Sequence, residues 1–205
     1  MIRYKDIELQ YSGKKIFSGF NLEVSENEKL LLAGPSGSGK TSLFRIILGF
    51  ERVNAGKVFF GDSEITARNI SYIRNNIFYL SQDIDFRNEK VASILEEIYS
   101  FEPNRGTVPG AGHQRQLMQM LDLGDEILQQ NLQQLSGGER QRVGLLVCFM
   151  LNRPVWLLDE PTASLDDRLR QKVVAYILEA GKTVIIISHD DIWRKNKTLR
   201  VERWS

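Results

Sequence analysis

The sequence predicts an α/β fold in which a largely parallel β-sheet is covered by helices. Short apolar runs, expected to be buried strands, alternate with segments of helical spacing. A glycine-rich loop stands between one of these runs and a helix, an arrangement that binds phosphate in many α/β proteins. The 205 residues, 42% of them hydrophobic, are enough for one domain with a substantial core.

The individual elements are placed by the period of their apolar residues. Residues 2–10 alternate between apolar and polar, whereas the run at 29–33 is apolar after its first residue, which favours a strand buried on both faces. The expected strands cover residues 2–10, 21–24, 29–33, 57–60, 77–80, 155–158 and 183–187. Helices are expected at 42–48, 91–101 and 114–121 and in the apolar stretch after residue 135, with a Gly/Pro-rich loop at 103–112.

Composition narrows the class of protein. The chain has 27 basic and 26 acidic residues, so no broad positive surface for nucleic acid is expected. Its one cysteine, Cys148, excludes an intramolecular disulfide, and its apolar neighbours indicate a core residue. The longest apolar run is about half of the ~20 residues that a membrane span needs. If the protein works at a membrane, another chain is expected to supply the spans.

The first motif that carries chemistry is GPSGSGKT at residues 34–41, a full match to the phosphate-loop pattern G-x-x-x-x-G-K-[ST]. Its glycines let successive backbone N–H groups converge on a polyphosphate, and the following helix adds its N-terminal N–H groups. Lys40 is expected to reach the β- and γ-phosphates, and the Thr41 hydroxyl to bind Mg²⁺. The expected nucleotide contacts are Gly34, Pro35, Ser36, Gly37, Ser38, Gly39, Lys40, Thr41 and Ser42.

The second motif is the strand Val155–Leu158 followed by Asp159 and Glu160. The carboxyl end of a strand is where α/β folds bind ligands. Asp159 is expected to hold Mg²⁺, and Glu160 to orient and polarise the attacking water. By itself such a pair is more often a solvated strand end, and its distance from the phosphate loop favours the functional interpretation.

The third motif is LSGGERQ at residues 135–141, which by itself indicates a serine-capped helix start with two glycines. Together with the other two motifs, in this order, it resembles the signature of ATP-binding cassette (ABC) transporter ATPases over nearly the whole chain. The resemblance implies a P-loop NTPase fold of the RecA-like type: a mostly parallel core, an antiparallel β subdomain and an inserted helical subdomain. It implies one domain, 1–205, with a core at about 1–82 and 154–205 and a helical subdomain at about 83–153.

The resemblance also implies that two copies bind two MgATP molecules in a head-to-tail dimer, most simply a homodimer. In that arrangement Ser136, Gly137 and Gly138 of one subunit cover the ATP bound to the other. Asp166, in the sequence Ser-Leu-Asp at 164–166, matches the loop that crosses the dimer interface.

Three further residues match family positions around the nucleotide. Gln82 resembles the glutamine that contacts Mg²⁺ and the water, and His189 the switch histidine that contacts the γ-phosphate and Glu160. Tyr11 resembles the aromatic residue that stacks on adenine, with a core tyrosine packing the first hairpin as its alternative.

The sequence departs from the family pattern in two places. The helix segment at residues 142–149 lacks, in its middle, the alanine and arginine that family members usually carry there; the missing arginine questions a supporting contact but none of the expected ATP contacts. The chain ends 16 residues after His189, so no additional regulatory domain is expected.

The function implied is the ATP-hydrolysing subunit of a membrane transporter. The expected partner is a separate integral membrane permease, with the chain peripheral on the cytoplasmic face of the inner membrane and no nucleic acid bound. Phe86 is expected to form part of the groove that receives the permease. The alternatives are a soluble family member acting on nucleic acid or the ribosome, and a cassette that binds ATP without hydrolysing it. The transported substrate cannot be read from this chain.

Overall fold

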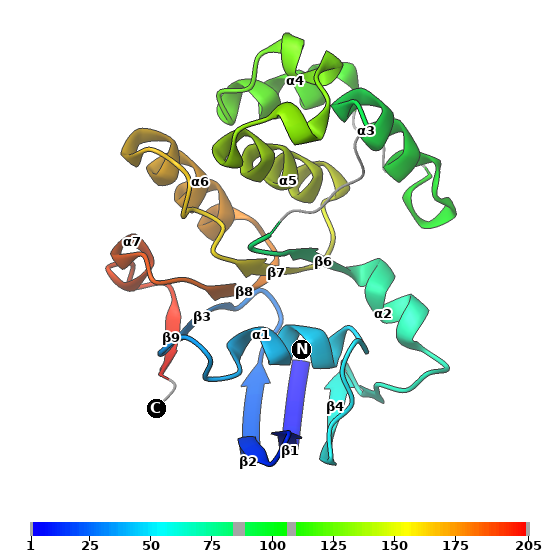
Figure 1. The fold of residues 1–205 in the computed structure, drawn as a ribbon, viewed down its shortest axis with the longest axis vertical. Coiled ribbons are helices and arrows are strands. Elements are labelled where there is room, and N and C mark those ends of the chain that lie inside the picture. The colour runs from blue at the N-terminus through cyan, green and yellow to red at the C-terminus, as the bar shows by residue number, and fades with distance from the viewer. Residues whose placement is uncertain (1, 84–88, 106–109, 204–205) are drawn as a thin grey trace.

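The structure, a computed structural model, describes residues 2–83, 89–105 and 110–203. Its strands form an antiparallel sheet of order β2-β1-β4-β5 and a parallel sheet of order β6-β7-β8-β3-β9 (Figure 1). The first sheet comprises β1 (Ile2–Tyr11), β2 (Lys14–Val24), β4 (Ala55–Phe60) and β5 (Ser63–Glu64). The second comprises β3 (Lys29–Ala33), β6 (Ile77–Leu80), β7 (Val155–Asp159), β8 (Thr183–Ile187) and β9 (Arg200–Arg203).

The helices occupy the segments between these strands. They are α1 (Lys40–Ile47), α2 (Ile70–Asn76), α3 (Val91–Ser100), α4 (Ala111–Met120), α5 (Gly137–Leu151), α6 (Asp167–Glu179) and α7 (Asp191–Arg194). Short 3₁₀ turns lie at Glu102–Asn104, Asp125–Gln129 and Leu132–Gln134. No helix within the described residues is both long enough and apolar enough to cross a bilayer.

The central strands β3, β7 and β8 of the parallel sheet are buried on both faces, which explains their nearly unbroken apolar sequences. In β3, Leu30 and Leu32 pack toward one hydrophobic cluster, whereas Leu31 packs toward the other. The same alternation holds for β7, where Leu157 and Leu158 point to opposite clusters. The central strands are therefore fixed from two sides, and their carboxyl ends are rigid supports for a site.

Helix α1 lies between the two sheets, as Figure 1 shows. Its buried residues Leu43, Phe44 and Ile47 share one cluster with residues of both sheets. The hydroxyl of Tyr4, in β1, donates to the Leu43 carbonyl at 2.9 Å. The antiparallel sheet is thus fastened to the helix that begins at the phosphate loop.

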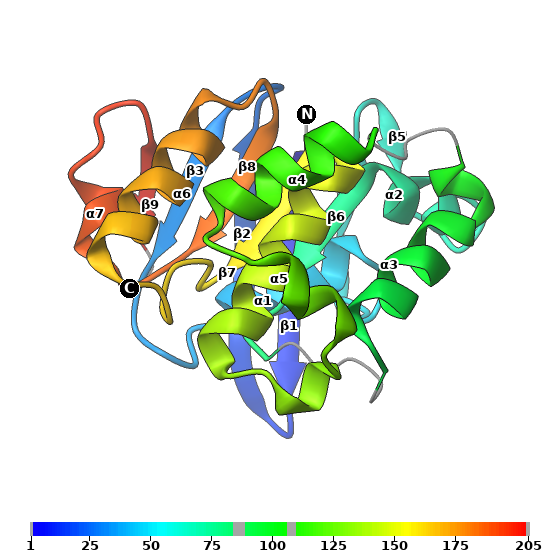
Figure 2. The ribbon, with the colours of Figure 1, turned by 90° about the horizontal axis from the view of Figure 1, so that it is seen from above.

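Helices α3, α4 and α5 lie together at one end of the molecule (Figures 1 and 2). The apolar stripe of α3 contributes Val91, Ile94 and Leu95 to the core of this part. Those three side chains therefore pack the helices, while Phe86 lies outside the described residues. Cys148, expected in the core, is fully buried in α5, and burial raises the pKa of its thiol.

Most expected strands are confirmed, several of them to the residue. The structure differs from the expectation in β2, which begins at Lys14 instead of 21, because polar residues and a glycine at 14, 15, 18 and 19 interrupt the apolar ones and leave no regular strand period. The elements α2, α6, α7, β5 and β9 were not given bounds from the sequence; the burial of β5 and β9 is slight. In the expected loop at 103–112, helix α4 already begins at Ala111, and residues 106–109 lie outside the described part.

Candidate functional site

The candidate site is a cavity of about 570 Å³ at the carboxyl ends of the parallel strands. Strand β3 pairs with β8, β8 with β7 and β7 with β6, so the segments that follow these four strands meet along one edge. The cavity is lined by Tyr11, Ile16, Ser36, Gly37, Gly39, Lys40, Thr41, Ser42, Gln82, Asp159, Glu160, Ala163, Ile187 and His189. Residues from five separate segments therefore face one space.

The phosphate loop wraps around the start of α1. Gly39 caps the helix with a φ of 94°, a left-handed conformation that favours glycine. A Cβ at this position would also lie 2.5 Å from Ile16 Cγ2 and 2.9 Å from Phe17 Cζ. Glycine is required here for two reasons: its left-handed backbone conformation and the lack of space for a Cβ.

Lys40 folds back onto this loop. Its Nζ donates to the carbonyls of Gly34 at 2.9 Å and Pro35 at 2.8 Å, and only 6% of the residue is exposed. Burial lowers the pKa of Lys40, and the charges of Asp159 and Glu160 act in the opposite direction. The two carbonyls thus hold the Lys40 ammonium beside the cavity, where it can bind an anion.

Thr41 and Asp159 offer a site for a hard cation. The Thr41 hydroxyl donates to Asp159 Oδ2 at 2.9 Å, and Asp159 is 4% exposed. Burial raises the pKa of Asp159, while the hydrogen bond from Thr41 lowers it. No group of three or more His, Cys, Asp or Glu side chains with metal-ligand geometry occurs in the described part of the chain. One carboxylate and one hydroxyl fit Mg²⁺, which takes few protein ligands and completes its shell with phosphate and water.

Glu160 is held in an unusual conformation at the end of β7. Its φ is 49°, and its N–H donates to the Ile187 carbonyl at 2.8 Å. The carboxylate accepts from Ser188 Oγ at 3.0 Å and from the His189 N–H at 3.1 Å. The ring nitrogen Nε2 of His189 lies 3.9 Å from the same carboxylate. Glu160 is therefore fixed by the end of β8 and opens into the cavity.

Tyr11 and Gln82 also line the cavity. Tyr11 is the last residue of β1, is 42% exposed and has its hydroxyl oxygen 3.4 Å from Ser42 Oγ. Gln82 comes two residues after β6. An exposed aromatic ring at the rim is free to stack on a flat ligand, which the alternative of a buried core tyrosine does not allow.

The signature residues lie outside this cavity. Ser136 caps α5: its Oγ accepts from the Glu139 N–H at 3.2 Å, and Glu139 Oε2 accepts from the Ser136 N–H at 2.8 Å. This reciprocal capping also lowers the pKa of Glu139. Gly137 and Gly138 begin the helix, and none of these residues lines the cavity. A single chain thus has a phosphate loop and a separate helix start at different places.

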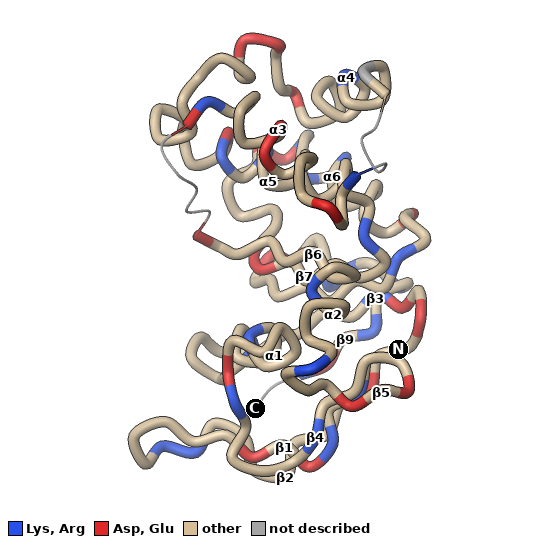
Figure 3. Tube along the Cα trace, turned by 90° about the vertical axis from the view of Figure 1, so that its right-hand side faces the viewer, with Lys and Arg blue, Asp and Glu red and all other residues tan. Residues whose placement is uncertain are grey.

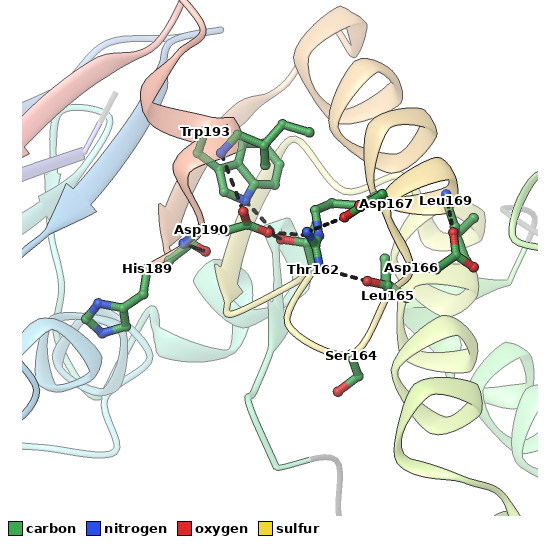
Figure 4. Close-up of polar contacts among 12 residues, drawn as sticks. Thr162, Ser164, Leu165, Asp166, Asp167, Leu169, His189, Asp190 and Trp193 are labelled. Atoms are coloured by element: carbon green, nitrogen blue, oxygen red, sulfur yellow. Dashed lines mark hydrogen bonds and ion pairs between the residues drawn. The ribbon is translucent and has the colours of Figure 1, made fainter.

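Asp166 likewise lies outside the cavity, where it caps α6. Its Oδ1 accepts from the Leu169 N–H at 2.9 Å, as Figure 4 shows. The loop before it is tied to the segment after β8 by the Thr162 hydroxyl, which donates to Asp190 Oδ2 at 3.2 Å. Trp193 Nε1 in turn donates to Thr162 Oγ1 at 3.1 Å, and all three residues are seen together in Figure 4.

An ion pair strengthens the same connection. Arg170 Nε lies 3.0 Å from Asp190 Oδ2, and its Nη2 donates to the Leu165 carbonyl at 2.9 Å. The loop at 162–166 and the segment that carries His189 are therefore parts of one hydrogen-bonded unit.

Some lining residues were not identified from the sequence. They are Ile16, Ala163 and Ile187. Ser188, which does not line the cavity but donates a hydrogen bond to the Glu160 carboxylate, was not identified either. Ser188 gives a weak signal, since it is the polar residue that ends an apolar strand just before His189. Gly34, Pro35 and Ser38 do not line the cavity: the carbonyls of Gly34 and Pro35 bind Lys40, and Ser38 Oγ donates to Pro35.

The fold and this cavity define a protein of the P-loop nucleoside-triphosphatase class. A family model described as "ABC transporter" matches residues 17–163, more than half of the chain. The chain belongs to the ABC transporter family.

Individual relatives agree with this assignment. The chain is 32% identical over 198 residues to a sulfate/thiosulfate import ATP-binding protein, CysA, of Xylella fastidiosa, covering 92% of this chain and 56% of the relative. It is 33% identical over 200 residues to a spermidine/putrescine import ATP-binding protein, PotA, of Spiroplasma citri, covering 93% of this chain and 55% of the relative. The chain thus spans little more than half the length of these relatives.

A solved structure agrees as well. The dimeric structure of MJ0796, a bacterial ABC transporter cassette, superposes with a TM-score of 0.83 at 25% identity, covering 99% of this chain and 94% of that chain. The expected RecA-like fold with its parallel and antiparallel sheets is confirmed.

Proposed function

We propose that this chain hydrolyses MgATP as one half of a head-to-tail dimer and so drives a separate integral membrane permease. The observation that carries the proposal is the meeting of Lys40, Thr41, Asp159, Glu160 and His189 in one cavity, with the signature serine outside it. The cavity contains the groups that are expected to bind phosphate and to orient the water, but not the signature serine. This arrangement suits a second copy of the chain that supplies its own signature serine as a lid.

The geometry of the site supports a role for each of its residues. When nucleotide enters, the Lys40 ammonium exchanges its hydrogen bonds to the Gly34 and Pro35 carbonyls for bonds to phosphate oxygens, since an ammonium binds an anion more strongly than it binds neutral carbonyls. Asp159 and Thr41 hold Mg²⁺, with Gln82 at its edge, and the ion supplies charge neutralisation on the phosphates. Glu160 orients the attacking water, and His189 fixes its carboxylate. Tyr11 stacks on adenine.

We also assign a role to the residues of this chain that would face the partner subunit. Ser136, Gly137 and Gly138 cover the ATP of the other subunit with the N-terminal N–H groups of α5. Asp166 and its loop lie at the interface between subunits. The division of 1–205 into a core and a helical subdomain at about 83–153 remains a prediction, as does the docking role of Phe86.

Transport is favoured over the soluble alternative by two observations. Both relatives named above are import proteins, which favours work with a permease at the cytoplasmic face of the inner membrane. Basic and acidic residues are also interspersed along the chain trace in Figure 3, and the net charge is +1, which gives little basis for nucleic-acid binding. The cassette that binds without hydrolysis is disfavoured by the complete set of Lys40, Asp159, Glu160 and His189.

The role of Glu160 is tested with Glu160→Gln. This variant should bind ATP normally and lose at least ~10²-fold in turnover, roughly 3 kcal/mol of transition-state stabilisation. It should also sediment as a dimer with ATP and as a monomer or weak dimer without it. Glu179→Gln, an exposed change on α6, is the matched control and should behave as wild type. Near-normal turnover of Glu160→Gln would remove Glu160 from this role.

The head-to-tail arrangement is tested by mixing two inactive variants, Lys40→Ala and Ser136→Arg. Each alone loses both sites of its dimer. If Ser136 covers the partner's nucleotide, the mixed dimer contains one site with an intact loop and an intact lid, so ATPase activity returns on mixing. If Ser136 acts within its own chain, both sites of the mixed dimer carry a defect and no activity returns.

A further inference from the structure

Gln141 joins the signature helix to the segment that carries Glu160. It lies in α5, four residues after Gly137, and is only 8% exposed. Its Nε2 donates to the Glu160 carbonyl at 2.5 Å, and its Oε1 accepts from the Ser164 N–H at 3.0 Å. Both ends of one buried amide are therefore used on the segment 160–164, and the side chain does not line the cavity.

The backbone of Glu160 needs such a support. A φ of 49° is unfavourable for a residue with a side chain, so the conformation persists only where its surroundings hold it. The Ile187 carbonyl binds the N–H of Glu160, and Gln141 binds its carbonyl. Because rotation of either peptide plane would swing the carboxylate, the two hydrogen bonds together set its direction.

The Gln141 side chain and the start of α5 contact the same loop residue, Ser164. Gly138 packs so near the loop that an added Cβ would be 2.9 Å from the Ser164 carbonyl oxygen. Gln141 is about one helical turn further along and binds the N–H of the same Ser164. A shift of the helix start is thus passed directly to the segment 160–164.

We propose that Gln141 is a positioning residue that holds the Glu160 backbone in its left-handed conformation and couples it to the start of α5. Closure of this helix start on the nucleotide of the partner subunit then also adjusts the water-orienting carboxylate of its own chain. The inference rests on the proposed roles of Glu160 and of the signature serine.

Two variants test the proposal. Gln141→Met keeps the shape and removes both hydrogen bonds, and Gln141→Glu keeps an oxygen for the Ser164 N–H but places a second oxygen against the Glu160 carbonyl. Each should lower kcat about 10-fold, as the loss of one positioning hydrogen bond does, and leave ATP affinity within about 2-fold. The control is Arg142→Met, which removes the hydrogen bonds of the next residue of α5 to the Leu121 and Asp122 carbonyls and should leave kcat within about 2-fold.

A double-mutant cycle separates positioning from a structural role. In the Glu160→Gln background, Gln141→Met should cause no further loss in single-turnover hydrolysis, because the group that it positions is already gone. An equal 10-fold loss in both backgrounds, a loss of ATP affinity in place of kcat, or an equal effect of Arg142→Met would overturn the proposal. If Glu160→Gln itself hydrolysed ATP normally, the proposed role of Glu160 would fail first, and that result is read independently of Gln141.

Discussion

The Thr41 hydroxyl and the Asp159 carboxylate are hydrogen-bonded at 2.9 Å although 118 residues separate them in the sequence. Thr41 is the second residue of α1, which follows β3 and the phosphate loop. Asp159 is the last residue of β7, which lies two strands from β3 in the parallel sheet. This hydrogen bond holds the two groups that are proposed to bind Mg²⁺ next to each other. The cost is a carboxylate kept in a poorly hydrated place.

That cost makes a pH-dependent prediction for Asp159→Asn. Burial raises the pKa of Asp159 in the folded chain, so the folded state keeps its proton to a higher pH than the unfolded state does. Stability then falls as the pH rises from the ordinary value of 3.8 through the folded pKa, and the asparagine variant escapes this loss. The Tm of the variant minus that of wild type, measured with EDTA and without nucleotide, should increase from about pH 4 to pH 7. A constant difference over this range would contradict the prediction.

Ser188→Ala tests the support of Glu160 from β8. The serine hydroxyl donates to Glu160 Oε2 at 3.0 Å and accepts from the Asp190 N–H at 3.1 Å. Without it the carboxylate loses a directional contact, so kcat should fall about 10-fold while the Kd for ATP stays near that of wild type. Ser100→Ala, at the exposed end of α3, is the control. An unchanged kcat would show that the His189 N–H alone suffices to hold Glu160.

The sequence located the strands that are buried on both faces and was less successful elsewhere. Runs such as Lys29–Ala33 and Thr183–Ile187 have one unbroken apolar signal, and the strand bounds follow from it. Strand β2 and strand β9 have polar, exposed residues at most positions, so their pairing with β1 and β3 decides their existence. Tertiary contact, not local pattern, defines these edges.

The site divides in the same way. The phosphate loop and the acidic pair are contiguous motifs, and their residues could be named from the sequence. Ile16, Ser188 and Gln141 come from other segments, and only the folded chain brings them to the phosphate loop or to Glu160. A motif gives the reacting groups, whereas the groups that hold them are scattered, because any nearby donor of suitable length can serve.

Gly39→Ala and Gly37→Ala form a matched pair in the phosphate loop. Both glycines have a positive φ, 94° and 77°, so both substitutions carry backbone strain of about 1–2 kcal/mol. Only at Gly39 does the added Cβ meet side chains, those of Ile16 and Phe17, while nothing lies within 4 Å of it at Gly37. Chemical denaturation should therefore show a larger loss of stability for Gly39→Ala. Equal losses of stability would mean that the Ile16 and Phe17 side chains of β2 move aside at little cost.

Thr162→Val tests the hydrogen-bonded unit that joins the loop at residues 162–166 to the segment that carries His189. Thr162 and Trp193 are both fully buried, and valine keeps the shape of threonine but leaves Trp193 Nε1 and Asp190 Oδ2 without the hydroxyl. An unsatisfied buried donor costs about 1–3 kcal/mol, so the Tm should fall by about 5 °C for a chain of this size. Thr198→Val, on an exposed turn, should change the Tm little.

The double variant Thr162→Val with Trp193→Phe decides whether the hydrogen bond is the cause. Phenylalanine removes the indole N–H together with its need for an acceptor, at the expense of some packing. If the unsatisfied N–H accounts for the loss, the double variant is more stable than the sum of the two single changes predicts. Simple additivity would assign the loss to packing around Thr162, and the connection from the loop at residues 162–166 to Asp190 would then depend on the Arg170 ion pair alone.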